Sequence, residues 1–314
     1  MPTSSQFRAG LAFGMVAYLC WGAVPLYFAQ VKDVPAPEIL AHRIGWSMPL
    51  MMALTMLTPG GVGKLWAVLR SRRLLFTLLL SATFLSGNWL LYIHATVTHR
   101  VSEASLGYYM MPVVNAFLAT LFLGERLRPA HYPALALISF GVAVPFVVQG
   151  VFTWLAVALP VTFGLYGLIR KKIPVDSGTG LTVETLLLVL PCAGYVGVKM
   201  WDGTAVFGRD LALSGWLAFG GVVTVVPLLT YTLSIRRIPL VTQAMIQFVS
   251  PTVQLLLAVT VLGEWDAMTW DKWAAMGCVW VASAVFIADA VVQNQQARRA
   301  VQPRPELAEA VGAR

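Results

Sequence analysis

Charge is the property that this sequence lacks most. Only 11% of its 314 residues are Asp, Glu, Lys or Arg, whereas 58% belong to the apolar set and the mean hydropathy is +0.74. Soluble chains carry roughly a quarter charged residues, so this chain cannot cover a surface that faces water. The composition predicts an integral membrane protein made of helices, because lipid offers no partners to unpaired backbone amides.

Residues that hold metals or drive most catalysis are also scarce. The three cysteines and four histidines show neither the spacing of a zinc site nor that of a disulfide framework. The stretch TPGGVGKLW, which starts at Thr58, lacks the first glycine and the final Ser or Thr of a phosphate-binding loop. We also find no paired catalytic carboxylates and no nucleophile elbow. The sequence therefore predicts no enzyme, no cofactor, no metal and no direct use of ATP.

Ten stretches are apolar and long enough to cross a bilayer, which takes about 20 residues. They are 10–30, 37–57, 74–95, 103–123, 131–149, 152–169, 180–199, 215–235, 240–262 and 270–291. The first is too long and too bulky to be a cleaved signal peptide. The sequence predicts an all-α fold of ten transmembrane helices, followed by a polar tail at 293–314 that we expect to be disordered.

The cations are distributed unevenly between the loops. If the N-terminus is cytoplasmic, 16 of the 22 Lys and Arg residues fall in cytoplasmic segments and 5 on the other side, with Arg43 inside a span. Such an excess marks the cytoplasmic side, so both termini are predicted to be cytoplasmic. Because the basic residues are spread over short loops, the net charge of +8 does not indicate a nucleic-acid partner.

The chain contains an internal sequence repeat. YYMMPVVNAFLATLFLGE starts at Tyr108 and QFVSPTVQLLLAVTVLGE starts at Gln247, which places Pro112 and Pro251 139 positions apart. A weaker similarity relates WGAVPLY, which starts at Trp21, to FGLYGLI, which starts 142 positions later. The repeats fall in the fourth and ninth predicted helices, so the chain divides into two halves of five helices, 1–149 and 150–292.

An odd number of helices in each half means that the second half enters the membrane in the opposite direction. Inverted repeats of this kind are typical of secondary transporters, whose binding sites lie near mid-membrane. Pro112 and Pro251 each free a backbone carbonyl about halfway along a helix, and in lipid that group must face protein or a water-filled cavity. The prolines either line a central cavity or only kink tightly packed helices.

Charged side chains inside spans are costly and mark candidate functional sites. Arg43 either reaches back to the external interface or meets a partner or an anionic substrate. Glu184 is either a helix-start carboxylate or a group that binds a proton or a cation and couples it to transport. Glu38 reads as a helix-start signal, and for His42 packing or a hydrogen bond is favoured over proton transfer.

Polar and aromatic residues recur at helical spacing in several spans, which fits either interhelical hydrogen bonds or an amphipathic cavity. The candidate cavity residues are Trp21, Arg43, Asn88, Trp89, Tyr109, Pro112, Glu184, Tyr231, Gln247 and Pro251.

Several of these motifs together resemble the RarD group of the EamA family, within the drug/metabolite transporter superfamily. They are WGAVPLYF, EILAHRIGWS, NWLLYI, EASLGYY, LGERL, FGLYGLIRKK, GLTVETLLLVLP, VTVVPLL and IQFVSPTVQ. The resemblance implies a ten-helix permease of the cytoplasmic (inner) membrane, with helices 1–4 and 6–9 around a cavity and helices 5 and 10 peripheral. Met111 departs from the family, which usually has Asn there, and His94 stands where Trp is common.

These observations favour a secondary transporter, an exporter of a small amphipathic metabolite or drug that works by alternating access. A proton gradient is a candidate driving force. The alternatives are a passive facilitator of the same fold and, far less favoured, an intramembrane enzyme. The expected partners are a small-molecule substrate and the lipid bilayer, and the oligomeric state is left open.

Overall fold

The computed structural model describes residues 4–97, 101–129, 131–149, 154–261 and 269–301, and within these ranges the regular elements are all helices. In chain order they are α1 (Ser4–Gln30), α2 (Ala36–Leu57), α3 (Gly61–Leu69), α4 (Arg72–Val97), α5 (Val101–Leu123), α6 (His131–Gln149), α7 (Leu155–Lys172), α8 (Ser177–Trp201), α9 (Leu211–Ile235), α10 (Leu240–Ile246), α11 (Val249–Thr260) and α12 (Trp270–Val301).

A helix overlies each of the ten predicted stretches, except that 240–262 is covered by the pair α10 and α11. The sequence did not predict α3, which lies in the connection between α2 and α4. Gly60 adopts a φ of +70° at its start, a left-handed conformation that glycine accepts without strain. Leu65 and Val68 then turn the apolar face of α3 inward, where both are buried.

The last helix also differs from prediction. α12 continues to Val301, and so residues 293–301 are helical where the sequence predicted a disordered tail. The stretch QNQQARRAV contains Ala, Gln and Arg, which favour helix, and no Gly or Pro to stop it. Residues 302–314 lie outside the described ranges.

Within the described ranges, four helices are long and apolar enough to cross a membrane: Ser5–Gln30, Arg72–Ala95, Ser177–Trp201 and Leu211–Ile235. A fifth candidate is the pair Ala36–Leu57 and Gly61–Leu69, which is bent by 119°. Shorter apolar helices occupy Gly107–Leu123, His131–Val144 and Trp273–Ala282. The chain is therefore a multi-pass, all-helical membrane protein.

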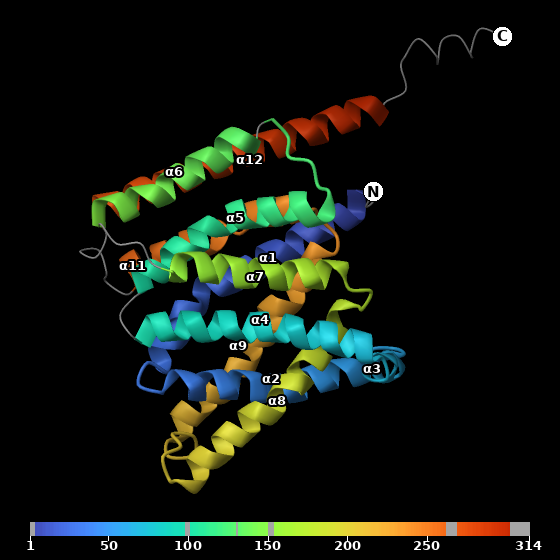
Figure 1. Ribbon diagram of the computed structural model, residues 1–314, viewed down its shortest axis with the longest axis vertical. Helices are drawn as coiled ribbons and strands as arrows, with labels where there is room; N and C mark the ends of the chain where they lie inside the picture. The colour runs from blue at the N-terminus through green and yellow to red at the C-terminus, as the bar shows by residue number, and fades with distance from the viewer. Residues whose placement is uncertain (1–3, 98–100, 130, 150–153, 262–268, 302–314) are drawn as a thin grey trace, which may run out of the picture.

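The helices pack side by side, and two of them stand apart from the rest. α6 and α12 pack along each other and form one edge of the molecule, with α2 and α8 at the opposite side (Figure 1). Between these edges, α1 packs on α9 and α11, α2 on α8 and α9, and both α4 and α5 on α7. The fifth and tenth predicted helices thus lie outside the central group.

The two repeated prolines occupy different local structures. Pro112 lies inside α5, which runs without a break from Val101 to Leu123. Pro251 is the third residue of α11, just after the interruption at Gln247 and Phe248 that separates α10 from α11. A proline cannot donate to the carbonyl four residues earlier, which for Pro251 belongs to Gln247. Only the second proline coincides with a broken helix.

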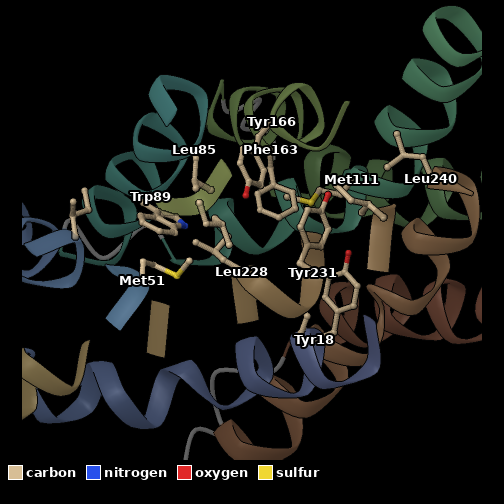
Figure 2. Close-up of a cluster of buried hydrophobic side chains, with 14 of the residues drawn as sticks. Tyr18, Met51, Leu85, Trp89, Met111, Phe163, Tyr166, Leu228, Tyr231 and Leu240 are labelled. Carbon is tan, nitrogen blue, oxygen red and sulfur yellow. The ribbon is translucent and has the colours of Figure 1, made fainter. Parts of the chain in front are cut away.

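Aromatic and aliphatic side chains fill the centre of the molecule (Figure 2). Trp89 and Met51 lie at the left of this cluster in the view, and Tyr231 and Tyr18 at the right. Helices in lipid gain little from the hydrophobic effect, because lipid tails are as apolar as the side chains. Close packing across this cluster is therefore what holds the helices together.

Candidate functional site

A small cavity lies between α2, α4, α8 and α9, beside the central cluster. Its volume is about 30 Å³, and its lining residues are Ile44, Ser47, Met51, Leu85, Trp89, Leu181, Glu184, Thr185, Leu188, Thr224, Val225 and Leu228. Pockets that hold drug-sized molecules span about 300–1,000 Å³. In this conformation the cavity accommodates water rather than an organic molecule, so the helices must separate to admit one.

The polar groups of the cavity sit on an otherwise apolar wall. Ser47, Thr185 and Thr224 supply hydroxyls, and Glu184 supplies the one ionisable side chain among the lining residues. Trp89 presents a large aromatic surface to the same space. Of the ten residues predicted to form a cavity, Trp89 and Glu184 are the two that line it.

Arg43 lies next to the cavity and inside the helix bundle. Its side chain is buried, with 4% of the residue exposed, and its Nε donates a hydrogen bond of 3.0 Å to Oγ1 of Thr224. The guanidinium carbon stands 4.7 Å from the ring centroid of Trp89 and 5.7 Å from that of Phe28. Between the two alternatives that the sequence left open, this placement favours an internal partner over a return to the interface.

Two glycines of α9 make room for Arg43. A Cβ at Gly220 would lie 2.5 Å from the hydroxyl oxygen of Tyr27 and 3.0 Å from Cγ of Arg43. A Cβ at Gly221 would lie 2.6 Å from the backbone of Trp46. Small residues at an interface let membrane helices approach closely. The glycine pair thus brings α9 against α2 and places Thr224, one turn later, beside the arginine.

Glu184 forms a buried ion pair with Arg170, at 3.7 Å between Oε1 and Nε. Both side chains are almost fully buried, at 1% exposure for Arg170 and 2% for Glu184. Nη2 of Arg170 also donates to the backbone oxygen of Ser177 at 3.0 Å. A Cβ at Gly180 would overlap Nη1 of Arg170, so glycine is what admits the guanidinium to this position.

Arg170 was missed as a site residue, because the sequence placed it with Lys171 and Lys172 in a cytoplasmic connection. It lies instead in the last turn of α7 and points inward. The signal was helical spacing: Arg170 follows Phe163 by seven residues and Tyr166 by four, and both of those side chains are buried. Because Arg170 is charged and adjoins two lysines, it was placed in a connection, although it belongs to the inward face of the helix.

Glu184 does not act as a helix-start carboxylate. α8 begins at Ser177, about two turns earlier, and its N-cap is Asp176. The carboxylate of Asp176 accepts hydrogen bonds from both the backbone nitrogen and the hydroxyl of Thr179, at 2.9 and 2.8 Å. Burial of Asp176 opposes its ionisation, but these two hydrogen bonds, together with the charges of Lys64 and Arg236, lower the pKa of the carboxyl.

Glu38 and His42 hold the connection between α8 and α9. Oε1 of Glu38 accepts hydrogen bonds from the backbone nitrogens of Val206 and Phe207, at 2.7 and 3.4 Å. The ring of His42 stacks on that of Phe207, with 4.7 Å between centroids. Glu38 does lie in the first turn of α2, as predicted, and it also pins a distant loop. His42 packs, which is the role that the sequence favoured.

Trp21 and Tyr231 belong to an aromatic cluster next to the cavity. The ring centroid of Trp21 lies 5.5 Å from that of Tyr231 and 5.5 Å from that of Phe163, and Phe163 lies 5.1 Å from Tyr231. Tyr18 and Tyr166 complete the cluster, which joins α1, α7 and α9. Trp21 and Phe163 are the residues that begin the two related motifs of the sequence.

The remaining predicted residues have partners on other faces of their helices. The side-chain amide of Asn88 donates to the backbone oxygen of Leu159 at 2.8 Å, which ties α4 to α7. The hydroxyl of Tyr109 donates to the sulfur of Met276 on α12. The amide of Gln247 donates to the sulfur of Met111, at the position where the resembling family usually has Asn. The predicted cavity residues therefore lie at several different helix–helix interfaces and not around one cavity.

Glu125, in the first Gly-Glu of the repeated pattern, connects three helices. Its Oε1 lies 3.1 Å from Nζ of Lys171 at the end of α7, and it accepts a hydrogen bond of 3.1 Å from the backbone nitrogen of Leu240 at the start of α10. Lys171 also donates to the backbone oxygen of Ile238 at 2.9 Å. The second Gly-Glu, at 263–264, lies outside the described residues.

The side chains of the described ranges do not assemble a metal site: no group of three or more His, Cys, Asp or Glu among them is placed to hold an ion. Cys20, Cys192 and Cys278 are free thiols.

Comparison with known proteins gives three findings. The model of the EamA-like transporter family matches residues 8–147. The chain is 40% identical to Protein RarD of Salmonella typhimurium, over 93% of this chain and 99% of that one, and 39% identical to an uncharacterized transporter of Vibrio cholerae, over 95% and 98%. A solved crystal structure superposes with a TM-score of 0.66 at 19% identity, over 88% of this chain and 96% of that one, which is a likeness of fold.

Proposed function

The chain belongs to the RarD group of the EamA-like transporter family, and on that premise we propose that it is a secondary transporter. It exports a small amphipathic metabolite or drug by alternating access, driven by protons. The relative from Vibrio cholerae is itself named as a transporter, which favours transport over catalysis. The observation that carries the proposal is the buried ion pair between Arg170 and Glu184, of which Glu184 lines the cavity.

The proposed architecture is ten membrane spans in two inverted five-helix repeats, residues 1–149 and 150–292, in the inner cell membrane. Both termini, including the tail from residue 293, are cytoplasmic. The helices over all ten predicted stretches and the excess of Lys and Arg in alternate connections support this arrangement. The contact between Trp21 and Phe163, at equivalent places in the two halves, supports it further.

The ion pair supplies a way to couple protons to movement. A buried pair holds its place only while both charges are present, because a single buried charge is strongly destabilising. When Glu184 takes up a proton, Arg170 loses its counterion. The electrostatic attraction between α7 and α8 at this point is then lost, which favours their separation. Since Glu184 also lines the cavity, protonation and the opening of the cavity are linked at one side chain.

Transport into inverted membrane vesicles tests the proposal. In inverted vesicles that contain the protein, export from the cell corresponds to uptake into the vesicle. The vesicles are energised with a proton gradient and screened with labelled amino acids, nucleobases and amphenicols. We expect at least one compound to accumulate above equilibrium and to leak out when a protonophore is added. Glu184→Gln, which keeps the size but not the proton site, should lose uphill accumulation. No accumulation of any compound would contradict secondary active transport.

A passive facilitator of the same fold is the second candidate. It would equilibrate the substrate across the membrane at a rate independent of the proton gradient. Comparing the final internal concentration with the external one separates the two functions.

A further inference from the structure

Arg43 is a buried cation for which the described chain provides no anion. The ion pairs of the described residues are Arg128–Asp289, His131–Asp289, Arg170–Glu184 and Lys171–Glu125. Arg43 has instead one hydrogen bond, to the neutral hydroxyl of Thr224, and two aromatic rings. Burying a guanidinium without a counterion is costly in a membrane protein, so the position has a use that packing does not supply.

A buried hydroxyl without a hydrogen-bond partner lies beside Arg43. The hydroxyl of Tyr27 is buried and makes no hydrogen bond, and only 4% of the residue is exposed. This hydroxyl and the stem of Arg43 lie on the same glycine, Gly220, which has no side chain to separate them. A buried hydroxyl without a partner destabilises a fold. A hydroxyl without an acceptor and a guanidinium without a counterion are therefore placed side by side.

The other buried charges of the described residues form no ion pair with Arg43. Glu184 and Arg170 neutralise each other. Oε1 of Glu38 accepts from the backbone nitrogens of Val206 and Phe207, and Glu38 takes part in none of the ion pairs of the described residues. Among the described residues, the wall beside Arg43 therefore holds a guanidinium without a paired carboxylate, which favours an anion and opposes a cation.

Arg43 adjoins the cavity through two of its contacts. Thr224 and Trp89, which both contact the guanidinium, also line the cavity. From there the wall continues with apolar side chains such as Leu85, Leu188 and Leu228. A ligand that suits this wall has a charged head at Arg43 and an apolar body along Trp89.

We propose that the cavity binds an organic anion, with an apolar body and a carboxylate or similar head held by Arg43 and Tyr27. This inference rests on the proposed function, because it names the class of substrate. A guanidinium offers paired N–H donors that match the two oxygens of a carboxylate. The phenolic hydroxyl adds a third donor, and the helices separate to admit the body.

Equilibrium binding to purified protein in detergent tests the proposal without a need for transport. The probes are 3-phenylpropanoate, indole-3-acetate and octanoate, each paired with its primary amide, which has the same shape but no charge. At neutral pH we expect at least one acid to bind about tenfold or more tightly than its amide, because hydrogen bonds to charged groups are the stronger ones. No preference for any acid would overturn the proposal.

Variants separate recognition from stability. Arg43→Gln should bring acid and amide to equal affinity, whereas Arg43→Lys, which keeps the charge, should retain part of the preference. Tyr27→Phe should weaken acid binding and yet leave the melting temperature unchanged or higher, because it removes a hydroxyl that has no partner. Arg237→Gln is the matched control, since Arg237 also stacks on a ring, Phe13, but lies away from the cavity. It should change nothing.

An acid preference that persists in Arg43→Gln would overturn the assignment, as would a loss of preference equally large in Arg237→Gln. The test also separates this inference from the proposed function. Uphill transport of neutral or cationic compounds, with no acid preference in binding, would contradict the organic-anion substrate but support the transport function. Selective binding without transport in vesicles would do the reverse.

Discussion

Trp21 and Phe163 stand 142 positions apart in the chain and meet nearly edge to face, with 5.5 Å between ring centroids and an interplanar angle of 81°. Each begins one of the two related motifs of the sequence. In a protein built from two inverted copies, equivalent residues approach one another only near the axis that relates the copies. Their contact places that axis, under the proposed architecture, beside the aromatic cluster and the cavity.

Gly180 is expected to be a sensitive position, because a methyl group there would overlap the guanidinium of Arg170. The side chain of Arg170 must then move away from Glu184. We expect Gly180→Ala to lower the free energy of unfolding by about 1–3 kcal/mol, the usual cost of overpacking. Thermal and denaturant unfolding in detergent measure it.

The same helix provides a control for that substitution. A Cβ at Gly194 would meet nothing within 4 Å. Gly194→Ala should leave stability unchanged or raise it by up to about 1 kcal/mol, since alanine is the better helix former. If the two alanine variants were equally stable, the tight fit of Arg170 against α8 would be wrong.

Gly221 is expected to tolerate substitution even less well. A Cβ there would lie 2.6 Å from backbone atoms of Trp46, and backbone cannot rotate away as a side chain can. Gly221→Ala should therefore push α9 from α2, break the hydrogen bond between Arg43 and Thr224, and lower the unfolding free energy by about 3 kcal/mol. Gly215→Ala, in open space on α9, is the control and should have no such effect.

The Arg170–Glu184 pair should behave as a unit. Arg170→Met and Glu184→Gln each leave one buried charge without its partner, so each is expected to cost about 3–5 kcal/mol of stability. The double variant removes both charges and should cost clearly less than the two single effects together. A double-mutant cycle on unfolding free energies measures the difference. Additive effects would show that the two charges do not interact.

Asp176 should give the fold a dependence on pH. The hydrogen bonds from Thr179 lower the pKa of its carboxyl in the folded state, so the ionised form stabilises the start of α8. This contribution is complete above the unfolded pKa of about 3.9 and is lost as the pH falls through the lower, folded value.

Asp176→Asn isolates this effect, because asparagine still caps a helix but does not titrate. Unfolding free energies from neutral pH to about pH 3 should fall less steeply in the variant than in the parent protein. Equal slopes would contradict the assignment to Asp176.

The course of the helices could be predicted from the sequence, because lipid requires long apolar helices and turn residues mark their ends. The break between α10 and α11 and the amphipathic helix α3 could not, since both fall within or between apolar runs. Pro112 and Pro251 look alike in sequence, yet only Pro251 follows an interruption. Which proline breaks a helix depends on what packs beside it.

The inward face of each helix was harder to predict than its length. Spans that are apolar all round give no contrast between faces, so Asn88 and Tyr109 were assigned to a cavity although they pair with α7 and α12. Arg43 and Glu184 were identified because charge in a span is rare. Arg170 escaped, because its place after a run of apolar residues looked like a connection.

The proposed inverted arrangement of the two halves is tested most directly by the side of the membrane on which the two Gly-Glu motifs lie. Reporter fusions that end just after Glu125 and just after Glu264, one series with alkaline phosphatase and one with a fluorescent protein, measure it. The account predicts a cytoplasmic reporter at Glu125 and an external one at Glu264. Reporters on the same side of the membrane would contradict it.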